Sequence, residues 1–251
     1  MKVLVTGGSG VFGSYLVQYL KNLTNWEVLA PSRLDVNICD KIDIDTNVDY
    51  IIHAAALRYG TPRNTVDVNI FGTMNILEFA ESCGANLLYI SSIDVIGPKD
   101  NEGLNPTTIY SSTKYAGEVL CQRSKVPVTI LRPVNIYPDI RKFPQICKEH
   151  IIKREKITIF TGGRMYVHRD DVCNAIRLII ESGLTGIFNM TGERIENLDV
   201  AQIVSNQLKI PFEYELKEGG PGNEPEINIP SCERLLTLGW QLTHKFSSIH
   251  W

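Results

Sequence analysis

Short apolar runs alternate along this chain with longer segments in which apolar residues recur every three or four positions. The runs have the length of strands and are rich in β-branched residues, and they cover 2–6, 27–30, 49–53, 87–91 and 126–131. Segments of helical period lie between them, at 11–20, 64–82 and 110–124. Regular alternation of strand and helix predicts an α/β fold with a parallel sheet and right-handed crossovers.

The first strand runs directly into a glycine-rich turn with Gly7, Gly10 and Gly13 at equal spacing. Gly7 allows a tight turn, Gly10 lets a pyrophosphate reach backbone N–H groups at a helix N-terminus, and Gly13 lets the helix lie close to the strand. The first helical residues, Val11 and Phe12, are further candidate contacts. Strand, glycine turn and helix together predict a dinucleotide site in a Rossmann-like, doubly wound sheet.

The end of the second strand bears on the choice of dinucleotide, because it would face the adenosine ribose. An acidic residue about 20 positions past the glycines would bind both ribose hydroxyls, but that position is Arg33. Ser32 can donate a hydrogen bond and Arg33 can pair with a phosphate, which favours NADP over NAD. The alternative is that Arg33 is a solvated loop charge. The third strand contains His53, which we expect to pack, and then small residues that a flat cofactor could approach, Ala54, Ala55 and Ala56.

The pattern loosens after Pro133 into small pieces. Helices are expected at 143–153, 170–181, 198–208 and 231–238, and strands at 157–160 and 186–190. These pieces are too small to fold alone, so we expect a small α+β C-terminal lid over the strand ends, where ligands bind. The expected division is a dinucleotide-binding domain of 1–134 plus 166–192, and a substrate-binding domain of 135–165 plus 193–251.

Composition excludes several classes of partner. The 251 residues carry a net charge of −3, so nothing steers the chain towards nucleic acid or an anionic membrane. The start of the chain does not have the pattern of a signal peptide, and no apolar run reaches membrane-spanning length. The six cysteines are scattered, which is typical of reduced thiols and not of disulfides or metal ligands. We therefore expect a cytoplasmic protein without a metal site.

Tyr110 and Lys114 lie four residues apart on a predicted helix and so share a face. A free tyrosine has a pKa of roughly 10, and a neighbouring ammonium favours its phenolate. Such a pair can exchange a proton with a hydroxyl while a hydride moves to or from its carbon. Ser92, at the end of a strand, could hold the substrate oxygen against Tyr110. The alternative interpretation is a surface aromatic residue beside a charge.

Eight stretches in this order are similar to the extended short-chain dehydrogenases/reductases, the NAD-dependent epimerase/dehydratase family: TGGSGVFG, LDV, IIHAAA, VNIFGTMNILEFA, YISSIDVIG, YSSTK, LRPVNIYP and RMYVHRDDV. The resemblance implies that Ser92, Tyr110 and Lys114 are catalytic, and that Tyr110 and Lys114 also contact the cofactor. It further places four residues at the cofactor site: Asp35 and Val36 by the adenine, Asn69 in a water relay to the lysine, and Pro133 beside the nicotinamide.

The family's common substrates are nucleotide-diphosphate sugars, and the resemblance implies that Arg164 and Asn135 bind the substrate. The alternative for Arg164 is an ion pair with Asp170 and Asp171, which we expect to begin a helix, to cap it and to pair with its dipole. Sugar-nucleotide 4,6-dehydratases carry an Asp-Glu pair where this chain has Ile93 followed by an aspartate. Because isoleucine cannot transfer protons, this departure argues against a dehydratase.

The leading hypothesis is an NAD(P)-dependent 4-epimerase or 4-keto reductase of a nucleotide-linked sugar. A second hypothesis keeps the chemistry but takes a non-nucleotide ketone or alcohol. A third is a cofactor-binding sensor without catalysis. The resemblance also implies a homodimer in which helices 64–82 and 111–124 pair with their copies.

Overall fold

The computed structural model describes residues 1–44, 47–97, 104–138, 143–218 and 231–248. Its centre is a six-stranded sheet in the order β2-β1-β3-β4-β5-β9, and every neighbouring pair is parallel. The strands are β1 (Lys2–Thr6), β2 (Glu27–Leu29), β3 (Tyr50–His53), β4 (Asn86–Ile90), β5 (Val128–Arg132) and β9 (Gly186–Asn189). The prediction of a Rossmann-like, doubly wound sheet is confirmed.

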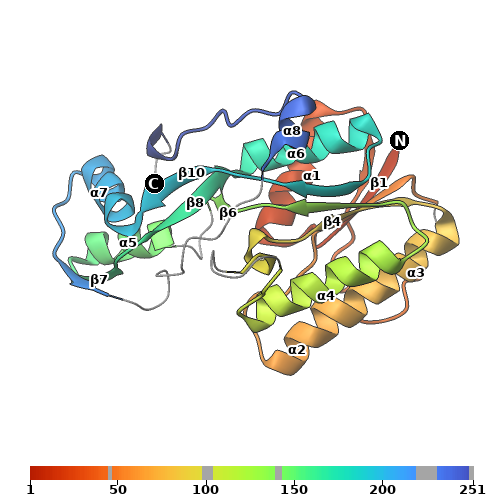
Figure 1. Ribbon diagram of the computed structural model, residues 1–251, viewed down its shortest axis with the longest axis horizontal. Helices are drawn as coiled ribbons and strands as arrows, with labels where there is room; N and C mark the ends of the chain where they lie inside the picture. The colour runs from red at the N-terminus through yellow and green to blue at the C-terminus, as the bar shows by residue number, and fades with distance from the viewer. Residues whose placement is uncertain (45–46, 98–103, 139–142, 219–230, 249–251) are drawn as a thin grey trace.

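Helices cover both faces of this sheet. Figure 1 shows α1 (Val11–Leu23) and α6 (Arg169–Ser182) on one face, with α3 (Gly72–Cys83) and α4 (Ile109–Arg123) on the other. Successive residues of β1 divide between the two faces: Val3 and Val5 belong to one buried apolar cluster and Leu4 to the other. Apolar residues of both alternating sets are therefore buried, which is why the strands read as continuous apolar runs.

The long helix expected at 64–82 has a break in its hydrogen-bond pattern. It consists of α2 (Pro62–Val66), a π-helical turn at Asp67–Phe71, and α3. Thr61 caps α2 by accepting a hydrogen bond from the backbone N–H of Asn64 at 3.2 Å. The π turn contains the buried Asn69, and such turns frequently accompany functional sites.

The C-terminal part contains more strands than its sequence pattern predicts. A three-stranded sheet, in the order β10-β8-β6, joins β6 (Asn135–Tyr137), β8 (Gly163–His168) and β10 (Glu193–Glu196). A two-stranded sheet pairs the expected β7 (Ile157–Phe160) with β11 (Tyr214–Lys217). Strands this short do not show a clear alternation, so only β7 and β9 were predicted. The parts of the expected lid at 139–142, 219–230 and 249–251 lie outside the described residues.

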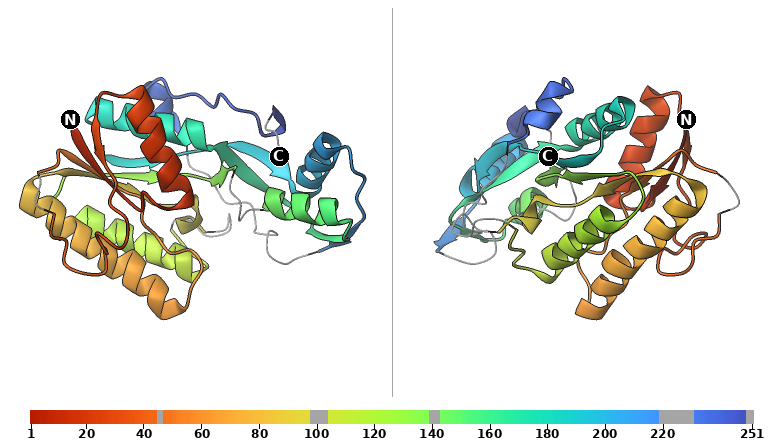
Figure 2. Two further views of the ribbon diagram at one scale, coloured as in Figure 1. Left: turned by 180° about the vertical axis from the view of Figure 1, so that it is seen from behind. Right: turned by 45° about the vertical axis from the view of Figure 1, so that its right-hand side comes forward.

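Two helices cover the small sheets and form an apolar core of their own. These are α5 (Phe143–Lys153) and α7 (Asn197–Leu208), which confirm the helices predicted there. Their core contains Cys147, Ile151, Val200 and Val204 together with residues of β7. Figure 2 shows β7, α5 and α7 grouped at the end of the molecule opposite the N-terminus. A short helix, α8 (Glu233–Thr237), lies within the range 231–238 that the sequence indicates.

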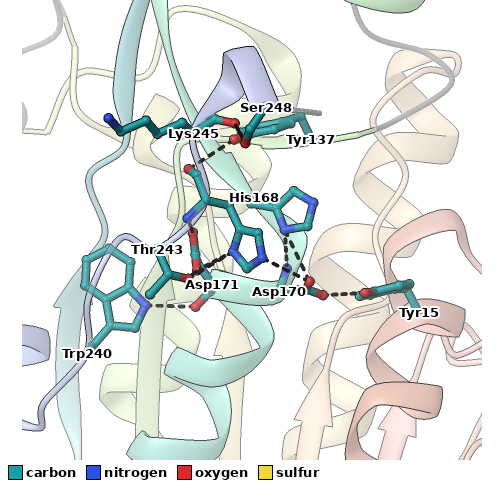
Figure 3. Close-up of polar contacts among 10 residues, drawn as sticks. Tyr15, Tyr137, His168, Asp170, Asp171, Trp240, Thr243, Lys245 and Ser248 are labelled. Atoms are coloured by element: carbon teal, nitrogen blue, oxygen red, sulfur yellow. Dashed lines mark hydrogen bonds and ion pairs between the residues drawn. The ribbon is translucent and has the colours of Figure 1, made fainter. Parts of the chain in front are cut away.

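A polar cluster joins the start of α6 to the last described residues of the chain (Figure 3). His168 caps α6, because its Nδ1 accepts a hydrogen bond from the backbone N–H of Asp170 at 3.3 Å. Asp170 and Asp171 are therefore not the cap, but both lie in the first turn of the helix, where carboxylates pair with its dipole as expected. Asp170 accepts a hydrogen bond from the Tyr15 hydroxyl. Its Oδ2 lies 3.5 Å from His168 Nδ1 and 3.5 Å from His244 Nε2. Burial and the neighbouring His244 lower the pKa of His168.

Asp171 holds the C-terminal segment. Its carboxylate accepts hydrogen bonds from the Thr243 hydroxyl at 2.5 Å and from the backbone N–H of His244 at 3.2 Å, and it lies 2.9 Å from His244 Nδ1. The buried Trp240 donates its ring N–H to the Asp171 carbonyl at 2.8 Å. Two residues beyond His244, the buried Phe246 packs against Tyr137. The end of the described chain therefore connects α6 to the C-terminal core.

All six cysteine thiols are free. Along the described ranges, every helix is too short or too polar to cross a membrane.

His53 is fully buried at the end of β3, as expected for a packing residue. Its Nδ1 lies 2.7 Å from the Thr6 hydroxyl and its Nε2 lies 3.0 Å from the Thr73 hydroxyl. Burial, and to a smaller degree the charge of Lys114, lowers the pKa of His53 to about 3. The folded protein therefore keeps this imidazole neutral in conditions where the unfolded chain, with a pKa near 6.5, binds a proton.

This difference predicts a loss of stability in acid. The contribution of His53 is fully present above about pH 6.5 and is lost as the pH falls towards 3, by about 1.4 kcal/mol for each pH unit. Urea unfolding followed by tryptophan fluorescence at several pH values measures the slope. His53→Gln should flatten it, whereas the control His150→Gln, at a half-buried position on α5, should not. Equal slopes in His53→Gln and the unmodified protein would contradict the prediction.

Candidate functional site

A pocket opens at the carboxyl end of β1, where β2 and β3 flank β1 on opposite sides and the chain order of the strands reverses. This is the place where doubly wound sheets bind their ligands. The cavity volume is about 230 Å³. Its lining combines the glycine turn, the ends of β2 and β3 and the segment after β2, through Leu4, Thr6, Gly7, Ser9, Gly10, Pro31, Arg33, Val36, Asn37, Ile38, Cys39, Ala54, Ala55, Ala56, Leu57, Val68 and Ile76.

The glycine turn allows backbones to approach where side chains would collide. Gly7 has a φ of 72°, and a Cβ added there would lie 2.7 Å from the Ala55 Cα. A Cβ on Gly13 would lie 2.1 Å from the Gly7 carbonyl oxygen, so the first turn of the helix lies directly against the glycine turn that follows β1. Gly10 is the N-cap of α1. The N-terminus of α1 thus meets the pocket without a side chain in between, which suits a pyrophosphate.

The predicted cofactor residues separate into two groups. Seven line the pocket: Gly7, Gly10, Arg33, Val36, Ala54, Ala55 and Ala56. The remaining candidates lie outside this lining: Val11, Phe12, Ser32, Asp35, Asn69, Tyr110, Lys114 and Pro133. Asn37, Cys39 and Leu57 also line it and were not predicted. Leu57 directly follows the three alanines, which could have indicated it, but no periodic pattern marks Asn37 or Cys39.

The turn after β2 positions Arg33. The backbone N–H and the hydroxyl of Ser32 both donate to Asp35 Oδ2, at 3.0 and 2.7 Å. The hydroxyl bond and then the backbone bond lower the pKa of Asp35. Asp35 therefore closes its own turn, while Arg33 belongs to the pocket lining.

The start of α4 carries Tyr110 and Lys114. Thr108 and Ser111 form a reciprocal capping box, so the helix begins one residue before Tyr110. Lys114 is 2% exposed, its Nζ lies 4.2 Å from the centre of the Tyr89 ring, and burial lowers its pKa to about 8. Tyr110 is half-buried, and desolvation raises the pKa of its phenol to about 12.

A charge that the sequence pattern does not indicate lies beside the Tyr110 ring. The sequence assigns the ammonium of Lys114 the role of favouring the phenolate, and this ammonium lies over the neighbouring Tyr89 ring. Arg58 lies 5.2 Å from the centre of the Tyr110 ring, and it lowers the pKa of Tyr110 against the effect of burial. Arg58 has no partner at helical spacing, so the sequence pattern did not single it out.

A buried ion pair holds α4 against the sheet. The guanidinium of Arg132 donates from Nε and Nη2 to the two carboxylate oxygens of Glu118, at 2.8 and 2.5 Å. Ser91 donates its hydroxyl to Glu118 at 2.5 Å. These contacts link α4 to the ends of β4 and β5, and so fix the helix that bears Tyr110.

Ser92 and Pro133 lie at the same sheet edge. Ser92 is buried after β4, and its hydroxyl caps a short turn at Ile93–Val95 by accepting the Asp94 N–H at 3.2 Å. The Pro133 carbonyl, just after β5, accepts the Ile93 N–H at 3.0 Å. The turn packs against α4, so Ser92 and Tyr110 belong to neighbouring elements.

Asn69 connects the pocket to α4. Its amide oxygen accepts the Leu57 N–H at 2.7 Å, and its amide nitrogen donates to the Leu57 carbonyl at 3.0 Å and to the Thr113 hydroxyl at 2.9 Å. Both amide hydrogens and the amide oxygen therefore have partners within the protein. In this structure Asn69 positions the loop after β3 against the helix of Tyr110.

The predicted substrate residues lie on the three-stranded sheet. Asn135, on β6, donates its amide to the Met165 carbonyl of β8 at 3.2 Å. Arg164, on β8, is half-buried opposite Ile195 of β10. The alternative of an ion pair between Arg164 and the two aspartates is not what the structure shows, because Tyr15, His168, Thr243 and His244 are the partners of those carboxylates.

The model of the NAD-dependent epimerase/dehydratase family matches residues 3–191. Among curated proteins, a dTDP-D-glucose 4,6-dehydratase from Dictyostelium discoideum is 28% identical over 82% of this chain, which spans only 62% of that protein. A UDP-glucose 4-epimerase from Lactobacillus helveticus is 24% identical over 98% of this chain and 93% of its own length.

Solved structures show the same fold. A dTDP-4-dehydrorhamnose reductase ortholog from Clostridium acetobutylicum has a TM-score of 0.86 at 20% identity, over 98% of this chain and 96% of that one. The UDP-glucose 4-epimerase of Thermus thermophilus, in complex with NAD, has a TM-score of 0.80 at 24% identity, over 98% and 96%. The fold and the family match agree with the motifs, and the chain belongs to the NAD-dependent epimerase/dehydratase family.

Proposed function

We propose that this protein is an NAD(P)-dependent oxidoreductase or epimerase of a nucleotide-diphosphate sugar, acting at the sugar C4. One observation carries the proposal: α4 presents Tyr110, with the buried Lys114 one turn further on, at the sheet edge where Ser92 and the glycine-lined pocket also lie. The curated relatives that act on nucleotide sugars support the substrate class.

The side chains have complementary tasks. Tyr110 takes the proton of the substrate hydroxyl, or returns it to a ketone, while Ser92 orients that oxygen. Lys114 binds the nicotinamide ribose. The bound dinucleotide supplies the hydride acceptor or donor. The pocket fits such a group, because its glycines and alanines leave room for a flat ligand beside a helix N-terminus.

We favour the 4-keto reductase with NADP over the epimerase. Arg33 lines the adenosine end of the pocket, where a guanidinium can pair with a 2′-phosphate, and Asp35 is engaged by Ser32. Ile93 is buried and apolar, which argues against a dehydratase. A solved relative from Pseudomonas aeruginosa, RMD, is complexed with NADPH.

We propose that residues 135–165 and 193–251 form the substrate-binding lid, with Arg164 and Asn135 on the substrate side. A guanidinium at Arg164 suits a diphosphate because it can bind two oxygens at once. The free thiols support a location in the cytoplasm.

Tyr110→Phe should lower kcat by roughly 10² to 10⁴-fold, because it removes the proton donor and acceptor. Cofactor affinity should change little. The measurement is the change in NAD(P)H absorbance with a panel of nucleotide sugars and their 4-keto forms, beside fluorescence titration of the cofactor. Tyr115→Phe, on the same helix, is the matched control and should keep its activity. Full turnover in Tyr110→Phe would refute the proposed chemistry.

Arg33→Gln should weaken NADPH binding about 10- to 100-fold and leave NADH binding nearly unchanged, since a charge-assisted hydrogen bond contributes about 1.5–3 kcal/mol. Calorimetric titration with both cofactors measures the two affinities. Lys41→Gln, which removes an exposed charge outside the pocket lining, is the control. Tighter binding of NADH by the unmodified protein, or NAD released stoichiometrically from it on denaturation, would favour the epimerase.

We propose a homodimer through α3 and α4, which run side by side in both views of Figure 2. Phe71 directly before α3, Met74 on α3 and Val119 on α4 expose 49, 37 and 40% of their surface. Light scattering should show twice the chain mass of 28.2 kDa. Met74→Glu combined with Val119→Glu should yield monomers, whereas Ile152→Glu on α5 should not. A monomeric unmodified protein at micromolar concentration would contradict the proposal.

A further inference from the structure

Three segments meet around the Tyr110 phenol. The loop after β3 contributes Arg58, whose guanidinium lies 5.2 Å from the centre of the Tyr110 ring and 5.8 Å from that of Tyr59. The turn after β4 contributes Asp94, whose Oδ2 lies 3.9 Å from Arg58 Nη2. A positive and a negative group therefore lie together next to the expected acid/base, and the proposed chemistry assigns neither of them a role.

The protein holds this arrangement in place from both sides. The backbone N–H of Leu57, directly before Arg58, donates to the amide oxygen of the buried Asn69, and the Leu57 carbonyl accepts from the Asn69 amide nitrogen. The same amide nitrogen also donates to the Thr113 hydroxyl. Thr113 in turn donates to the Tyr110 carbonyl at 2.8 Å. The loop of Arg58 and the helix of Tyr110 are thus connected through one buried amide.

The backbone of Asp94 is also held in place, because its N–H donates a hydrogen bond to the Ser92 hydroxyl at 3.2 Å. The ion pair itself is long, and Arg58 and Asp94 expose 36 and 27% of their side chains. Such a pair contributes little to stability. A structural role alone gives no reason for placing it against the phenol.

The two charges act on the phenol in opposite directions. A guanidinium over the ring attracts the phenolate, and a carboxylate nearby repels it. The groups that face Tyr110 are Arg58, which lowers the pKa of the phenol, and Asp94 and Tyr59, which raise it together with burial. The ammonium of Lys114 lies over the Tyr89 ring, in the direction of the neighbouring strand.

We propose that Arg58 and Asp94 are positioning residues for proton transfer at Tyr110: the guanidinium stabilises the phenolate, and the carboxylate opposes that effect by repelling the phenolate. This inference rests on the proposed acid/base role of Tyr110. It makes the balance between two loop charges, and not the helix lysine alone, the device that adjusts the tyrosine to working pH.

The test compares Arg58→Gln, Asp94→Asn, their combination and Arg58→Lys. The first readout is the pH dependence of kcat/KM for hydroxyl oxidation. Arg58→Gln should move the limb that reports the phenolate about one pH unit upward, and Asp94→Asn should move it downward. The double variant should lie near the unmodified protein, and Arg58→Lys should lie between it and Arg58→Gln.

A second readout does not require turnover. In protein labelled with ¹³Cζ-tyrosine and loaded with oxidised cofactor, the Tyr110 resonance, assigned with Tyr110→Phe, should titrate with the same opposed displacements. Displacements in the same direction, or a resonance that none of the variants moves, would overturn the inference. If the two variants move the Tyr110 titration in opposite directions but the protein turns over no sugar nucleotide or 4-keto form, the proposed function is refuted. The electrostatic effect of Arg58 and Asp94 on Tyr110 is then still supported. If Arg58→Gln fails to fold, Arg58→Lys and Asp94→Asn decide the question.

Discussion

The close approach of three backbone segments at the carboxyl end of β1 is the constraint on which the rest of the structure depends. Gly7 meets Ala55, and Gly13 meets Gly7, at distances that leave no room for a Cβ. This contact lets α1 begin at the carboxyl end of the sheet and leaves a cavity where the strand order reverses. A side chain at either glycine would push helix and strand apart and remove the surface that suits a pyrophosphate.

The second requirement is a rigid helix at the neighbouring sheet edge. The capping box fixes where α4 begins, and the ion pair of Glu118 with Arg132 fixes how it lies on β5. Burying charges is costly unless they are paired and fully hydrogen-bonded, a condition that the bidentate geometry and the Ser91 hydroxyl meet. Tyr110 therefore projects from a helix whose position is fixed both at its N-terminus and in its second half.

The C-terminal segments depend on the sheet for their placement. Asp171, at the start of α6, binds Thr243 and His244, and Phe246 then enters the apolar core of the small sheets. Through this connection the residues that we assign to the substrate are held at the strand ends, although they come from the weakest patterns in the chain. Polar contacts between residues far apart in the chain thus decide how these short elements are arranged.

The sequence by itself determined the sheet, its helices, the glycine turn and the positions of Ser92, Tyr110 and Lys114, because periodicity and spacing are local properties. Only the tertiary structure decided which charge faces the phenol: Arg58 reaches Tyr110 through a loop whose direction is set by hydrogen bonds to Asn69. It also decided that Lys114 lies over a strand tyrosine, and that the short C-terminal strands pair at all. Contacts between residues far apart in the chain leave no period in the sequence, so they become visible only once the elements are packed.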